Sequence, residues 1–148
     1  MNNNRFVVAV HLVALLAVEN KTGLTTSECL ADSAGTNPVV VRRLLGQLSR
    51  AGLVKAQVGT GGGVRLLRPP EQITLLEIYR AVGEKPLLSL DLRKPNPDCF
   101  CGRSIRPILG DVFDQIEQAA GAIFAGTTIA DLAAEVNSKD ALPRAERV

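Results

Sequence analysis

The glycine-rich segment over residues 58–70, VGTGGGVRLLRPP, most constrains what this chain can fold into. Its four glycines are similar to those of a loop that holds a nucleotide phosphate. A P-loop, however, needs a Lys and a Ser or Thr after its last glycine, and a dinucleotide-binding loop opens a helix. Here Val64 and Arg65 follow, and they begin a strand-like pattern. The glycines therefore predict the tight tip of a β-hairpin, with strands over 53–58 and 63–68.

Two short helices precede this hairpin. The first is predicted over 27–33, where Thr25 and Glu28 have the spacing of a capping box. The second begins after Asn37, a favourable N-cap residue, with Pro38 at the first helical position. A helix pair joined by a tight turn and followed by a hairpin is the element order of a winged helix-turn-helix.

The flanking segments are also predicted to be helical. An apolar helix is expected over 4–20, and its lone His11 is expected to pack in the core. After the hairpin, helical patterns cover 74–82, 104–126 and 127–136. The expected fold class is therefore mainly α with a small two-stranded β-hairpin.

The pattern divides the chain into four parts. These are a winged helix-turn-helix over 1–83, a Pro-rich loop or hinge over 84–103, the long and short helices over 104–137, and a polar tail over 138–148. The apolar stripe of the long helix is wide enough to pack on the winged helix and on a partner helix. We therefore expect a homodimer whose interface residues are Ile105, Leu109, Val112, Ile116, Ala119 and Ile123.

Positive charge is concentrated in the front of the chain. Residues 1–70 hold 8 Lys or Arg against 3 Asp or Glu, which is +5, whereas residues 71–148 hold 9 against 12, which is −3. A basic front indicates contact with a polyanion. Together with the winged helix, it predicts that residues 1–83 bind double-stranded DNA.

The second helix of such a pair lies in the major groove of DNA. Arg42 and Arg43 suit guanine, and Val39 and Val40 suit thymine methyl groups. Two alternatives stay open, namely that the Arg pair is only solvated and that Asn37 only caps its helix. The predicted DNA-binding residues are Thr26, Ser27, Thr36, Asn37, Pro38, Val39, Val40, Arg42, Arg43, Lys55, Gly61, Gly62 and Arg65.

The segment over 51–82 resembles the signature of Rrf2-type transcription regulators, with "AGLV", the glycines of the wing and "ITLLEI" in place. "NPVVVRRLL" and "PNPDC" are similar to the YwnA-like branch of that family. The resemblance implies a winged helix followed by a long dimerisation helix, and a dimeric DNA-binding regulator, usually a repressor. A two-fold dimer predicts a pseudo-palindromic operator. Several family members use cysteines to sense iron–sulfur status, nitric oxide or oxidants.

Two residues depart from the family pattern. Val58 stands where the wing usually has an Arg that reaches the minor groove, and Val64 replaces the usual aromatic residue. Lys55, Arg65 or Arg68 are the candidates to replace the missing Arg.

The three cysteines, Cys29, Cys99 and Cys101, are too few for a secreted disulfide framework and indicate a cytoplasmic protein. A [2Fe–2S] cluster needs four thiolate or imidazole ligands, but the Pro-rich loop holds only Cys99 and Cys101, Cys29 is far away in sequence, and His11 is expected in a buried helix. We therefore expect no cofactor and no metal, with an iron–sulfur cluster as the alternative. Oxidation that links Cys29 to Cys99, in one chain or across a dimer, would shift the recognition helices. The alternative is that Cys29 is a small buried residue and Cys99 is inert.

Other functional classes are disfavoured. With one His and no Ser/His/Asp pattern or C-x-x-C motif, the chain is not expected to be an enzyme. The apolar run over 6–18 is shorter than the ~20 residues of a membrane span, so no membrane partner is expected. Two alternatives to a thiol-controlled regulator stay open. One is a regulator that senses a small ligand or iron–sulfur status, and the other is a winged-helix adaptor for protein contacts.

Overall fold

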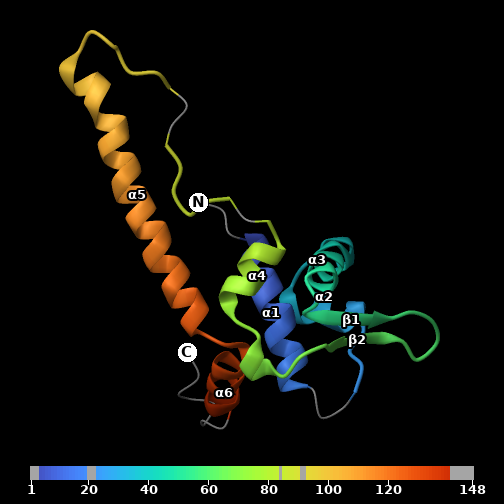
Figure 1. Cartoon of the computed structure of the whole chain (residues 1–148). Helices are drawn as coiled ribbons and strands as arrows, with labels where there is room; N and C mark the ends of the chain where they lie inside the picture. Colours follow the sequence, from blue (N-terminus) through green and yellow to red (C-terminus); the bar gives the residue numbers. More distant parts are fainter. Residues whose placement is uncertain (1–3, 20–22, 84, 91–92, 141–148) are drawn as a thin grey trace. The chain divides into compact units, whose positions relative to one another are not determined.

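The computed structural model describes residues 4–19, 23–83, 85–90 and 93–140. These residues form mostly helices and one two-stranded antiparallel sheet (Figure 1), which confirms the predicted fold class. The chain divides into two compact units, residues 2–84 with 124–148 and residues 85–123. The elements are α1 (Asn4–Val18), α2 (Ser27–Ala34), α3 (Pro38–Arg50), β1 (Val54–Gln57), β2 (Gly63–Leu66), the 3-10 helix η1 (Pro70–Gln72), α4 (Leu75–Ala81), α5 (Phe100–Gly126) and α6 (Ile129–Asp140).

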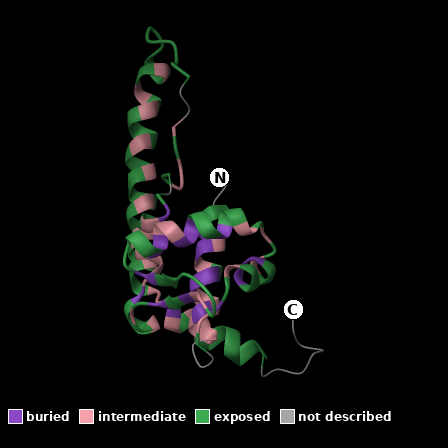
Figure 2. Ribbon diagram, turned by 90° about the vertical axis from the view of Figure 1, so that its right-hand side faces the viewer, coloured by how far each residue is buried: buried purple, intermediate pink, exposed green. Residues whose placement is uncertain are grey.

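Aliphatic side chains form the core of the first unit. Leu12 and Val13 of α1 and Leu48 of α3 have no exposed surface. Figure 2 shows buried residues gathered where these helices meet. α1 packs against α2, α3, α4, α6 and β2, so it lies at the centre of this unit.

The helix pair is fixed by local caps and by one contact with the hairpin. Thr26 is the N-cap of α2, and its hydroxyl accepts the N–H of Cys29 at 3.2 Å. The capping box predicted at Thr25 is therefore wrong. Thr25 instead exchanges two backbone hydrogen bonds with Val64, at 3.1 and 2.8 Å, and so extends the sheet. Gly35 ends α2 in the left-handed conformation, with φ of 60°.

The hairpin tip requires glycine for two separate reasons. Gly59 and Gly61 have φ values of 103° and 74°, which side-chain-bearing residues rarely adopt. A Cβ atom on Gly62 would lie 2.2 Å from the carbonyl oxygen of Gln57. The interpretation of this segment as a hairpin tip is confirmed.

α6 packs with the winged helix, whereas the sequence pattern groups its residues with the long helix in a unit over 104–137. The N–H of Ile129 donates to the carbonyl of Ile73 at 2.8 Å, and the N–H of Leu75 donates to the carbonyl of Thr127 at 3.0 Å. These two bonds join the start of α6 to the start of α4.

The second unit contains most of α5, a helix of 27 residues and therefore ~40 Å long. It begins at Phe100, so the predicted start at 104 is wrong. A turn in which the carbonyl of Asn96 accepts the N–H of Cys99 leads directly into the helix. Cys101 consequently lies in the first helical turn, not in a loop. No residue of α5 is buried.

Candidate nucleic-acid interface

α3 presents one face to the core and the other to solvent. Val41 and Leu44 are buried, whereas Arg42 and Arg43 are exposed and Val39 has 65% of its surface exposed. With 3.6 residues per turn, the exposed residues share one stripe of the helix. A stripe of this kind is what a recognition helix offers to the major groove.

The first residues of α3 serve the helix itself. The side-chain oxygen of Asn37 accepts the N–H of Val39 at 2.8 Å, and Pro38 occupies the first helical position. A bidentate contact with adenine needs the same oxygen, so it would compete with the cap. Thr36 is half-buried, and its N–H donates to the carbonyl of Ala31 at 3.0 Å. These residues position α3 more than they extend its exposed stripe.

Arg42 lies beside Glu28 of α2. The Nη2 and Oε1 atoms are 3.5 Å apart, and the two side chains keep 61% and 71% of their surface exposed. Such an exposed pair contributes little to stability, so it orients the guanidinium without withdrawing it from a nucleic acid. The sequence pattern does not predict this pair, because the spacing of Glu28 from Thr25 is that of a capping box.

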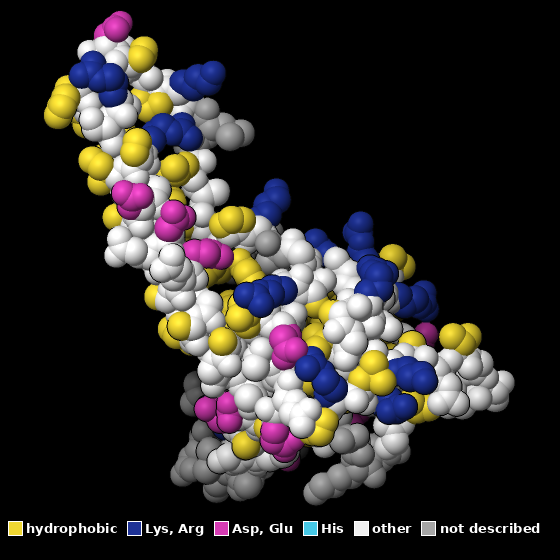
Figure 3. All heavy atoms as spheres, in the orientation of Figure 1, with side chains coloured by type: hydrophobic (Ala, Val, Ile, Leu, Met, Phe, Trp, Pro, Cys, Tyr) yellow, Lys and Arg dark blue, Asp and Glu magenta, His cyan; other side chains and the backbone are white. Residues whose placement is uncertain are grey.

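The hairpin adds two cations. Lys55 of β1 lies directly opposite Arg65 of β2 in the register, and both are exposed. The neighbouring Val54, Val64 and Leu66 are buried, so the hairpin has one core face and one basic outer face. Figure 3 shows Lys and Arg side chains gathered over the part of the molecule that holds α3 and the hairpin.

The two valines that depart from the family pattern have opposite environments. Val58 is 95% exposed beside the glycine tip, whereas Val64 is 2% exposed and pairs with Thr25. Val64 therefore fills the core, and Val58 places an apolar side chain instead of a cation beside the tip.

Arg68 does not belong to the basic outer face. Its Nη2 donates to Oε1 of Glu77 at 2.7 Å, and both side chains are about two-thirds buried. Among the described residues, the buried Nε of Arg68 has no hydrogen-bond partner. Glu77 also closes a capping box with Thr74 at the start of α4. Arg68 thus joins the segment after β2 to α4, which leaves Lys55 and Arg65 as candidates for the wing contact.

The thiols and the imidazole lie at the surface. Cys29, Cys99 and Cys101 are all exposed, so the interpretation of Cys29 as a buried packing residue is wrong. His11 is also exposed, which contradicts its expected place in the core. It projects from α1 toward α2, where its Nε2 and Oγ of Ser33 are 2.9 Å apart.

The Rrf2 family model, described as "Iron-dependent Transcriptional regulator", matches residues 2–135. The chain belongs to the Rrf2 family. The "Putative HTH-type transcriptional regulator YwnA" of Bacillus subtilis (strain 168) is 36% identical over 132 residues, which cover 89% of this chain and 96% of that protein. A crystal structure of "a putative DNA binding protein" is 34% identical, with a TM-score of 0.66, over 86% of this chain and 97% of that one. The structure of T. potens IscR, 20% identical, has the same fold, with a TM-score of 0.74 over 97% and 93% of the two chains.

This Rrf2-family protein is accordingly an HTH transcriptional regulator that binds DNA, and the prediction that it is not an enzyme is confirmed. The description of the family names iron. A [2Fe–2S] cluster needs four thiolate or imidazole ligands, so a cluster held within one chain would require all three Cys and the one His together. In the described part of the chain, no three His, Cys, Asp or Glu side chains gather as a metal site. This donor set does not fit a cluster held within one chain. Among the described helices, none combines the length and apolar character of a membrane span.

The contact between Arg68 and Glu77 predicts an acid-dependent loss of stability. Burial raises the pKa of Glu77, but the hydrogen bonds from Arg68 and Thr74 outweigh it and hold the pKa below the ordinary value of 4.5. A carboxylate with a lowered pKa stabilises the fold above its unfolded-state pKa, and this stabilisation disappears as the pH falls through the folded-state value. Glu77→Gln should therefore lower the free energy of unfolding at neutral pH by about 0.5 kcal/mol, a value discounted for solvent screening. The difference in the free energy of unfolding between Glu77→Gln and the native protein should shrink below pH 4.5.

Urea unfolding of both proteins across this pH range measures the effect. Glu71→Gln, in the exposed η1 turn, is the control and should leave the urea midpoint unchanged throughout. A deficit for Glu77→Gln that stays constant from neutral to acid pH would contradict the proposed role of the carboxylate charge.

Proposed function

We propose that this regulator acts in the cytoplasm as a homodimer that binds a pseudo-palindromic operator and represses transcription. The exposed stripe of α3 carries the proposal, because it combines Arg42, Arg43 and Val39 on a helix whose opposite face is anchored in the core. Two such helices related by a two-fold axis match two half-sites on one face of the duplex.

Within the proposed complex, the residues divide by chemistry. Arg43 and Arg42 read guanine edges, and Val39 and Val40 contact thymine methyl groups. Asn37, Pro38 and Thr36 act mainly by setting the start of α3. Thr26 and Ser27, at the start of α2, face the phosphate backbone, where helix N-termini favour anions.

The wing makes the second contact. Lys55 and Arg65 are the exposed cations of the hairpin, and they replace the Arg that the family usually has at the position of Val58. Gly61 and Gly62 allow the backbone of the tip to approach the sugar-phosphate chain closely. Because these groups meet phosphates, they contribute affinity rather than sequence selectivity.

Substitutions in the two elements should separate these roles. Arg43→Ala should lower operator affinity about tenfold and relax selection at one base pair of each half-site. Lys55→Ala should weaken binding to all sequences alike and reduce the salt slope by about 1 per contact. The measurement is fluorescence anisotropy of a duplex selected from a random pool, repeated over a salt series.

Arg80→Ala, which removes an exposed cation from α4, is the matched control and should leave affinity unchanged. If Arg80→Ala lowers operator affinity as much as Arg43→Ala does, net charge and not the exposed stripe of α3 accounts for binding. If the native protein shows no salt-dependent DNA affinity, the proposal fails in favour of a winged-helix adaptor.

The proposed dimer rests on α5. Leu109, Val112 and Ile116 keep about 40% of their surface exposed, although they are large and apolar. The predicted interface residues repeat at alternating steps of four and three, which is the spacing of a coiled-coil seam. A helix with this spacing and no buried residue is expected to bury its apolar seam against a partner helix. A second copy of the chain offers the same seam.

A charge placed in this seam should separate the protomers. Ile116→Glu is expected to give a monomer at micromolar concentration. It should also weaken operator binding at least tenfold, because two linked winged-helix units no longer bind the two half-sites together. Light scattering after gel filtration measures the mass, and far-UV circular dichroism checks that the helices persist. Gln115→Glu, one residue away, adds the same charge outside the seam and should remain a dimer. A dimeric Ile116→Glu protein would contradict this interface.

Thiol oxidation is the proposed control of DNA binding. Cys29 lies in the first turn of α2, close to the recognition helix, and Cys99 and Cys101 are also exposed. Hydrogen peroxide would take two electrons and two protons from Cys29 and Cys99, forming one disulfide and two waters. A bond between these residues, in one chain or across the dimer, would constrain α2 and with it α3.

Mild peroxide should therefore lower operator affinity, and dithiothreitol should restore it. Cys29→Ser should resist peroxide, whereas Cys101→Ser should respond like the native protein. Peptide mass spectrometry identifies the linked pair, and persistence of free Cys29 and Cys99 thiols after treatment would overturn the switch.

A further inference from the structure

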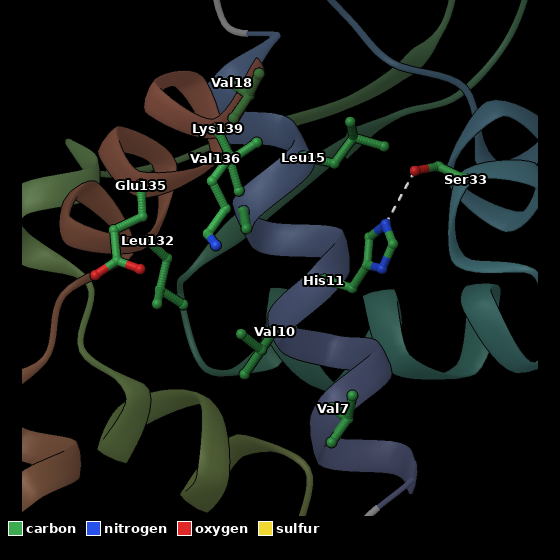
Figure 4. A pocket seen from close by; sticks show the side chains of 11 residues that line it. Val7, Val10, His11, Leu15, Val18, Ser33, Leu132, Glu135, Val136 and Lys139 are labelled. Atoms are coloured by element: carbon green, nitrogen blue, oxygen red, sulfur yellow. Dashed lines mark hydrogen bonds between the residues drawn. The ribbon is translucent and has the colours of Figure 1, made fainter. Parts of the chain in front are cut away.

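An apolar groove of about 550 Å³ lies between α1 and α6. Figure 4 shows Val10 of α1 on one wall and Leu132 and Val136 of α6 on the other. The groove follows α1 from Val7 to Val18, which corresponds to ~16 Å of helix. Its volume is within the range of about 300–1,000 Å³ typical of small-molecule sites. None of these residues belongs to the predicted DNA-binding or dimer surfaces.

The charged groups at the groove are arranged asymmetrically. In Figure 4 the ammonium group of Lys139 lies between α6 and α1, whereas the carboxylate of Glu135 points away from α1. Within the described residues, Lys139 has no hydrogen-bond or ion-pair partner. The third polar feature, the hydrogen bond between His11 and Ser33, lies on the side of the groove next to α2. The groove therefore offers an apolar wall with a cation at its edge.

The geometry points to a binding site for a small amphipathic organic anion, of the class of medium-chain carboxylates. The apolar tail lies along Val10, Leu132 and Val136, and the carboxylate meets Lys139. Burial of the tail supplies the affinity, and the ammonium group selects an anion over a cation with the same tail. This site gives the proposed regulator an effector, and thus rests in part on the proposed function.

The groove is connected to the recognition helix by two contacts. Ser33 lies in the last turn of α2, two residues before the left-handed Gly35 that leads to α3. Val7 lines both this groove and a neighbouring cavity of about 310 Å³, whose other walls include Thr36 and Val40 at the start of α3. A ligand that displaces Val7 or forms a hydrogen bond with the hydroxyl of Ser33 therefore changes the position of α3.

Titration calorimetry of the full chain with octanoate and with octylammonium tests the site. Octanoate should bind saturably at one site per chain, and about fivefold more tightly than octylammonium, because the two unbranched eight-carbon molecules carry head groups of opposite charge. Comparable or tighter binding of octylammonium would overturn the anion class. Absence of saturable octanoate binding would overturn the site.

Two variants and one control locate the binding. Lys139→Met should weaken octanoate about threefold, and Val136→Glu should weaken it at least tenfold by placing a like charge on the wall. Val136 is 49% exposed, so this variant is expected to fold. Val58→Glu makes the same exchange at a 95% exposed position of the wing and should bind octanoate like the native protein. If Val136→Glu and the native protein bind octanoate with equal affinity, the proposed site is overturned. If Val136→Glu changes the oligomeric state, the groove is a contact between copies of the chain, and the small-molecule site is overturned as well.

The link to DNA is measured separately, so that the two proposals fail separately. Saturating octanoate should change operator affinity at least threefold in the native protein and leave it unchanged in Val136→Glu. If octanoate binds but operator affinity stays constant, the coupling to α3 is overturned while the site stands. If octanoate binds and no duplex does, the proposed DNA function fails and the binding site does not.

Discussion

Burial of α1 is the constraint on which the rest of the winged-helix unit depends. Ala9, Leu12 and Val13 have no exposed surface, and each buried Leu or Val contributes roughly 1.5–3 kcal/mol. Surface pairs such as Arg42 with Glu28 contribute far less. Because α2, α3, α4, α6 and β2 all pack on α1, the position of the recognition helix is set by this core and not by its turn alone.

The sequence predicts the elements whose signals lie in neighbouring residues. Asn37 with Pro38 marks the start of α3, Thr74 marks the start of α4, and the glycines between two strand patterns mark the hairpin. It fails where a distant partner decides the outcome. Thr25 has a good local signal for a cap, but its backbone pairs with Val64, thirty-nine positions further along the chain, and the cap moves to Thr26.

The candidate interface divides in the same way. Periodicity alone separates the exposed Arg42 and Arg43 from the buried Val41, because the two faces of one helix repeat locally. It does not distinguish Arg65 from Arg68, since both are cations near the same hairpin. Only the position of Glu77 on α4 reveals that Arg68 is held in a structural contact. The hydrogen bond of the exposed His11 likewise depends on Ser33 of another helix.

The central position of α1 also explains how an effector could reach the DNA-binding face without a long route. One face of this helix is committed to the core, and its remaining apolar residues are left to line the groove with α6. Val7 then borders the start of α3 through the neighbouring cavity. In the proposed dimer, both winged-helix units must fit half-sites at one fixed spacing. A small shift of α3 therefore weakens the contacts in both half-sites, and the two losses multiply in the operator affinity. A ligand bound in a groove on the central helix thus needs to shift α3 only slightly to change operator affinity.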